Sequence, residues 1–84
     1  SSAASDVYKR QNIVGGKIRS LRQELGLSQD ELAARLQVQN VILSQKCISR
    51  MEKGERFITD YELLILSKVL KKDLYWLLGE ENKT

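Results

Sequence analysis

Apolar residues recur at helical spacing in five short segments of the 84-residue chain, and glycines or helix-capping residues separate the segments. The first segment, from about Asn12 to Leu25, carries an apolar stripe at intervals of three or four residues, and Gly26 ends it. Gly15 and Gly16 weaken its first turn by about 1 kcal/mol each relative to alanine. The pattern contains no strand run and no proline, so it predicts an all-α fold.

Two later segments each begin with a capping box, in which a hydroxyl residue and an acidic residue three positions on satisfy two free backbone donors. Ser28 and Glu31 form the first box, and Thr59 and Glu62 form the second. We expect the helices that follow to run from Gln29 to about Leu36 and from Tyr61 to about Lys71.

The connection after the second helix, residues 37–43, is apolar and rich in β-branched residues. Its apolar residues are Val38, Val41, Ile42 and Leu43. We interpret it as a long connection whose apolar side chains pack on the core. Alternatively, the second helix continues to about Val38, and Asn40 ends it.

The segment from Ser44 to Gly54 predicts a helix of about two and a half turns with two unlike faces. Ser44 can cap its first turn, and Gly54 can end it in the left-handed conformation. Ile48 and Met51 share the apolar face. The other face carries Gln45, Lys46, Ser49 and Arg50. Such amides, hydroxyls and cations read base edges and phosphates in a DNA major groove, so we interpret this segment as a recognition helix.

A last short helix begins after Asp73 and ends at Gly79, and we expect Trp76 and the two leucines after it to close the core rather than form a dimer interface. The five helices predict one compact domain, because the chain is too short for two. We expect the domain to span residues 12–79, between a flexible N-terminal segment at 1–11, which resembles a processed or cloning-derived end, and a polar tail at 80–84.

Charge and composition narrow the function classes. The net charge is only +3, with a pI near 9.2, but cations exceed acids in residues 1–26 and 44–58. This placement suits a protein that faces polyanionic DNA. The chain has no histidine, and Cys47, its one cysteine, is expected to be a small, half-buried filler. We therefore expect no enzyme activity, no metal, no cofactor and no disulfide, and no apolar run is long enough to span a membrane.

Three stretches resemble the lambda-repressor-like helix-turn-helix family, which includes Cro and the phage repressors and is also called XRE. They are LGLSQDELA at 25–33, ISRMEKGER at 48–56 and LYWLLG at 74–79. The resemblance covers about Ile13 to Gly79, and three motifs in order are more specific than one. It implies a five-helix domain that binds operator DNA as a homodimer on an inverted repeat, in the cytoplasm, encoded by a bacterium or a phage.

The resemblance also implies roles for particular residues. Gln29 resembles the residue that contacts the DNA backbone and braces the recognition helix. The implied major-groove residues are Gln45, Lys46, Ser49 and Arg50, and Ser44, at the start of the same helix, is also predicted to bind DNA. The implied phosphate contacts are Arg19, Lys53 and Arg56. Arg22 and Glu52 resemble a family ion pair that ties the first helix to the third.

The departure from the family pattern is a lengthened turn between the second and third helices. Ala33 and Ile48 are 15 residues apart, which is five more than the resemblance implies. The usual spacing would put Leu43 in the place of Ile48, and Gln39 and Asn40 at the bases. We reject that register because three features would then lose their places in the third helix: Ser44 as its cap, Glu52 as the partner of Arg22, and Gly54 as its end.

Two function classes follow. The first is a sequence-specific double-stranded DNA-binding regulator, most simply a repressor that occupies operator DNA. The alternative is an antitoxin-like or partner-regulated module that uses the same fold to hold another protein through its last two helices. An enzyme is disfavoured, because the sequence offers no histidine, a single cysteine and no phosphate-binding loop.

Overall fold

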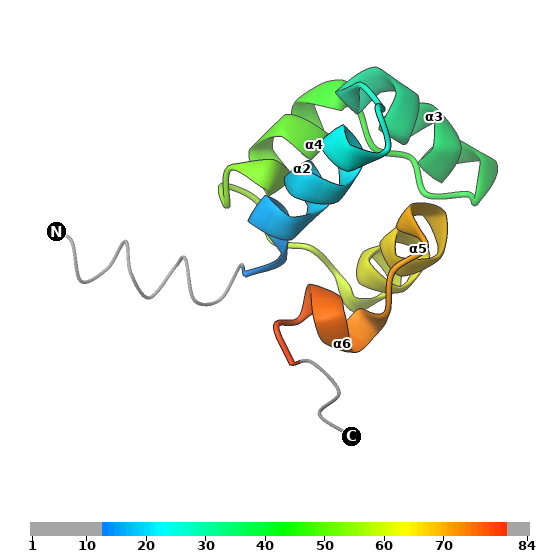
Figure 1. Cartoon of the computed structure of the whole chain (residues 1–84). Coiled ribbons are helices and arrows are strands. Elements are labelled where there is room, and N and C mark those ends of the chain that lie inside the picture. The colour runs from blue at the N-terminus through cyan, green and yellow to red at the C-terminus, as the bar shows by residue number, and fades with distance from the viewer. Residues whose placement is uncertain (1–12, 81–84) are drawn as a thin grey trace, which may run out of the picture.

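The computed structural model describes residues 13–80, and these residues form five helices in one bundle (Figure 1). The helices are α2 (Val14–Glu24), α3 (Gln29–Val38), α4 (Gln45–Glu52), α5 (Asp60–Leu70) and α6 (Leu74–Leu77). No strand occurs between residues 13 and 80. The prediction of an all-α, five-helix domain is confirmed. The expected N-terminal segment at 1–11, and all of the expected tail except Glu80, lie outside the described residues.

The bundle is arranged so that one face of α4 is covered and the other is left open. α2 packs against α4, α5 and α6, while α3 packs against α4 and α5 (Figure 1). The fully buried side chains at the centre are Ile18, Leu32, Leu36, Ile48, Met51, Leu66 and Leu77. Two of them, Ile48 and Met51, are the apolar face expected for the third helix, so its polar face points away from the core.

The predicted helix caps are present. Ser28 Oγ accepts a hydrogen bond from the Glu31 N–H at 3.0 Å, and the Glu31 carboxylate accepts one from the Ser28 N–H at 2.8 Å. Thr59 and Glu62 make the same reciprocal pair at 3.2 and 3.0 Å. Each pair satisfies two amides that have no partner inside their helix, and this fixes where α3 and α5 begin.

The long turn differs from our interpretation. α3 continues to Val38, as in the alternative, and Asn40 ends the turn at a positive φ of 64°. Only Val41 and Leu43 reach the core, whereas Val38 and Ile42 are 78% and 74% exposed. The reason is geometric: in the extended stretch before α4, alternate side chains point to opposite sides, so burying Val41 and Leu43 turns Ile42 outward.

Three smaller findings concern single apolar residues of the predicted helices. Leu25 is 46% exposed because it is the C-cap of α2, beyond the last helical turn. Leu78 is 40% exposed, although its neighbour Leu77 is fully buried. Ile65, in the middle of α5, is buried in the core. Trp76 is half-buried against the core, as expected, under the ammonium groups of Lys17 and Lys72.

Candidate nucleic-acid interface

The exposed face of α4 is the centre of the candidate site. Ser44 caps the helix by accepting a hydrogen bond from the Cys47 N–H at 3.1 Å, and Gly54 ends it at a φ of +77°. Gln45, Lys46 and Arg50 are exposed and Ser49 is half-exposed. The structure therefore adopts the register we chose, with Ile48 buried and four polar side chains on the opposite face.

A buried ion pair joins α4 to α2. Arg22 Nε and Nη2 donate to the two carboxylate oxygens of Glu52 at 2.7 and 3.0 Å, and both residues are less than a tenth exposed. Arg22 also donates to the Leu27 carbonyl at 2.9 Å, and its hydrogen bonds to the Glu52 carboxylate raise the pKa of its guanidinium. A two-pronged contact of this kind fixes orientation as well as distance. It therefore holds α4 at one angle to α2.

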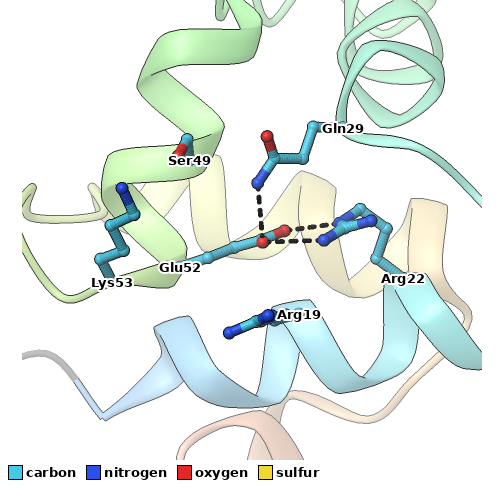
Figure 2. Close-up of a pocket in the computed structure, with 6 residues that line it drawn as sticks. All are labelled: Arg19, Arg22, Gln29, Ser49, Glu52 and Lys53. Atoms are coloured by element: carbon cyan, nitrogen blue, oxygen red, sulfur yellow. Dashed lines mark hydrogen bonds and ion pairs between the residues drawn. The ribbon is translucent and has the colours of Figure 1, made fainter.

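Gln29, at the start of α3, extends this contact to the exposed face of α4. Its Nε2 donates to Glu52 Oε1 at 3.0 Å, and its Oε1 accepts a hydrogen bond from Gln45 Nε2. Figure 2 shows Gln29 and Arg22 reaching the same carboxylate from two different directions. Side chains from α2, α3 and α4 thus form one hydrogen-bond network, which runs from Arg22 through Glu52 and Gln29 to Gln45.

A recess of about 200 Å³ lies beside this hydrogen-bond network, between α2 and α4. Its lining residues are Arg19, Arg22, Gln29, Ser49, Glu52 and Lys53 (Figure 2). Three cations and one carboxylate give the recess a net positive charge. Arg19 and Lys53 are exposed, and Glu52 already neutralises Arg22. These two exposed cations are therefore the groups most available to an anion such as a DNA phosphate.

Arg56, which the resemblance implies as a phosphate contact, forms an ion pair within the protein. Its guanidinium forms a two-pronged ion pair with Glu62 at 3.0 and 3.1 Å and donates to the Phe57 carbonyl at 3.0 Å. The hydrogen bonds that Arg56 donates to the Glu62 carboxylate raise the pKa of Arg56. Arg56 therefore ties the loop after α4 to the start of α5, and its charge is partly neutralised. Helical spacing does not predict this pairing, because a loop separates the two residues.

Cys47 is half-buried and packs against the core, as expected of a small filler. Hydrogen bonds with Ser44 lower the pKa of its thiol, and the positive charges of Arg56 and Arg50 lower it further. Within residues 13–80, no group of three potential ligands comes together to hold a metal ion. No helix in that range is long and apolar enough to cross a membrane.

The fold and this face define a helix-turn-helix protein, in which α3 braces α4 and α4 presents an open polar face. A family model described as helix-turn-helix matches residues 18–77. The chain therefore belongs to the lambda-repressor-like, or XRE, helix-turn-helix family of DNA-binding domains. Comparison with curated proteins found no match, and comparison with solved structures found none either.

Proposed function

We propose that this chain is a sequence-specific transcriptional regulator that represses by inserting α4 into the major groove of operator DNA. The observation that carries the proposal is the open polar face of α4, which a buried ion pair holds beside a positively charged recess. A fixed helix with amide and cationic side chains is the form in which helix-turn-helix proteins read bases.

Each side chain takes a role from its position. Gln45, Lys46, Ser49 and Arg50 contact base edges, since they lie on the open face. Arg19 and Lys53 contact phosphates beside the groove, from the recess between α2 and α4. Ser44 acts through its cap, which sets the start of α4. Arg56 is the weakest candidate for a phosphate contact, because Glu62 occupies its guanidinium.

In this proposal the protein binds an inverted repeat in the DNA as a homodimer. It acts in the cytoplasm of a bacterium, and its gene belongs to the bacterium or to a phage. Exposed apolar side chains on α5, on α6 and at the C-cap of α6 support a protein contact. They are Tyr61, Leu64, Tyr75 and Leu78, which are between 38% and 66% exposed. The same observation favours the second candidate function, a module that holds a different protein. Sedimentation of the chain alone and with its duplex distinguishes self-association from a need for another partner.

The test begins with selection of duplexes from a randomised library, followed by fluorescence-anisotropy titration against the selected and a scrambled duplex. We expect the selected duplex to bind about a thousandfold more tightly. Gln45→Ala and Arg50→Ala should each remove much of that preference. Arg35→Ala is the matched control, because Arg35 is an exposed arginine at the far end of α3. Equal affinity for both duplexes, or silent Gln45 and Arg50 variants, would reject the proposal.

A further inference from the structure

A second recess, of about 290 Å³, lies between the C-terminal ends of α3 and α5, and the proposed function makes no use of it. Its lining residues are Arg35, Val38, Gln39, Lys68, Val69 and Lys71. They include three cations and no acid, so the recess attracts anionic groups. They also include two valines, which offer an apolar contact between the charges.

The three cations are available to a ligand. Arg35, Lys68 and Lys71 are exposed, and none of them forms an ion pair with a residue between 13 and 80. Arg35 lies one turn after Glu31, where its charge adds to the lowering of the Glu31 pKa that hydrogen bonds with Ser28 mainly cause. No acid in the lining of the recess neutralises its charge.

The helix dipole accounts for only part of this arrangement. Cations in the last turn of a helix stabilise its negative end, which explains Arg35 in α3 and Lys68 in α5 without any partner. It does not explain Val38, which is 78% exposed at the end of α3 and gains nothing from the core. An exposed branched apolar side chain beside unpaired cations is typical of a contact surface.

The backbone of Lys71 gives a second, independent observation. Lys71 follows α5 in the left-handed conformation, at a φ of 56°, whereas the left-handed residue after α2, α4 and α6 is a glycine, at positions 26, 54 and 79. Glycine adopts this conformation without strain and lysine does not. The chain therefore keeps a strained residue whose side chain lines the recess, and such strain indicates a functional side chain.

The recess lies away from the candidate DNA-binding face. Gln29, at the start of α3, contacts Gln45 on the open face of α4, whereas Val38 is the last residue of α3 (Figure 1). At about 1.5 Å per residue, the two ends of α3 are about 13 Å apart. A chain that binds DNA through α4 therefore leaves this recess open to another molecule.

We propose that this recess is a docking site for an acidic segment of a different protein, whose carboxylates pair with Lys68, Lys71 and Arg35 around an apolar side chain that contacts Val38. Charge complementarity selects the acids. The valines select a protein, because a protein can place an apolar side chain between two carboxylates, whereas a nucleic-acid backbone repeats its charges at fixed spacing. The recess takes a few side chains rather than a whole helix, so the contact is small and transient.

Selection of short random peptides, displayed on phage, against the whole chain tests this docking. We expect the enriched peptides to carry at least two acids beside an apolar residue. One enriched peptide, labelled with fluorescein, is then titrated by anisotropy. We expect Lys68→Gln and Lys71→Gly each to weaken its binding by about fivefold. Val38→Thr, which keeps the branched shape but adds a hydroxyl, should weaken it as well.

Lys53→Gln is the matched control, because it removes the same charge from the recess beside α4, and we expect it to leave peptide binding unchanged. An equal loss in Lys53→Gln and Lys68→Gln means attraction by net charge alone and overturns the inference. Enriched peptides without acids also overturn it. So does a peptide that binds the Lys68→Gln, Lys71→Gly double variant as tightly as the wild type.

Lys71→Gly separates a docking role from a structural one. Glycine relieves the left-handed strain, so we expect the Tm of this variant to rise by a few degrees while its peptide binding weakens. A purely structural role for Lys71 predicts no loss of peptide binding in a more stable variant, and that result contradicts the inference.

Two further results assign the recess to another occupant and overturn the inference. One is displacement of the peptide by a scrambled duplex in the Arg19→Gln, Lys53→Gln double variant, which means that the recess takes nucleic acid. The other is self-association in sedimentation that Lys71→Gly abolishes, which means a second copy of this chain. The peptide titration needs no DNA, so its outcome is independent of the outcome for the proposed function.

Discussion

The carbonyl oxygen of Met51 in α4 lies directly against Gly15 in α2, so a Cβ added at Gly15 would collide with it. Gly15 is buried at this crossing, where α2 carries no side chain between the two backbones. The glycine lets α4 approach α2 closely enough for Arg22 and Glu52 to pair. The position of the candidate DNA-binding face thus depends on the absence of a Cβ atom at Gly15.

We expect Gly15→Ala to destabilise the fold by about 2 kcal/mol, because the methyl group forces two helix backbones apart. Gly16→Ala is the control in the same turn. An added Cβ at Gly16 meets no atom within 4 Å, so the lower backbone entropy of alanine should raise stability by about 0.5 to 1 kcal/mol. Urea unfolding of the two variants measures both changes, and a similar effect of the two substitutions would contradict this account.

The Arg22–Glu52 pair should couple strongly in a double-mutant cycle. Glu52→Leu leaves the Arg22 guanidinium buried without its partner, and we expect a loss of about 3 to 5 kcal/mol. Replacing both residues with leucine should cost less than Glu52→Leu alone, since no charge is then left unpaired. Chemical denaturation gives the four free energies of unfolding, and additive losses would show that the pair is not coupled.

The ion pair between Arg56 and Glu62 provides the comparison, because it has the same two-pronged geometry nearer the surface. The Arg56 side chain is 28% exposed, against 10% for Arg22. We expect a coupling energy of about 1 kcal/mol for this pair. A coupling as large as that of Arg22 and Glu52 would mean that burial is not the source of the difference.

Glu62 should make the fold sensitive to acid. Hydrogen bonds from Arg56, and further ones from Thr59, hold its pKa below its usual value. Its contribution to stability is therefore full above the unfolded pKa of about 4.3 and is lost as the pH falls through the lower folded value. We expect Glu62→Gln to lower stability at pH 7 and to have a smaller effect at pH 3. Urea titrations at the two pH values measure this, and an equal effect at both would contradict it.

The sequence predicts those features of the fold that depend only on residues a few positions apart along the chain. The capping boxes at Ser28 and Thr59, and the left-handed glycine at 54, work through hydrogen bonds and backbone angles within a few positions. Each was found from spacing alone and is present in the structure. The pairing of Arg22 with Glu52 was also predicted, but through family resemblance, since 30 residues separate the two.

Features that depend on how the helices cross could not be predicted in the same way. From the sequence alone, Gly15 is a residue that destabilises a helix. Its packing role cannot be predicted from neighbouring residues, because Met51, which it contacts, lies in a segment far along the chain. Ile42 looked like a core residue, because composition does not show which side of an extended segment is covered. The Gln29 to Gln45 bond needs the relative placement of α3 and α4 across the lengthened turn.

The recess between α2 and α4 predicts how DNA binding depends on salt. Each phosphate neutralised by a cation releases counterions, and this steepens the fall of affinity with salt by about 0.9 log units of affinity per log unit of salt. We expect Arg19→Gln and Lys53→Gln each to reduce the slope by about that amount for specific and scrambled duplexes alike. Anisotropy titrations over a range of salt concentrations measure the slope.

The matched control for these variants is Lys68→Gln, which removes the same charge from an exposed lysine on α5. Lys68 lines a different recess, with Arg35 and Lys71, on the side where α3 and α5 end. Its removal changes the net charge of the protein as much as the removal of Lys53 does. An unchanged slope in Lys68→Gln would therefore place the effect at the recess beside α4. An equal reduction in all three variants would mean that DNA responds only to net charge, and that Arg19 and Lys53 make no particular phosphate contact.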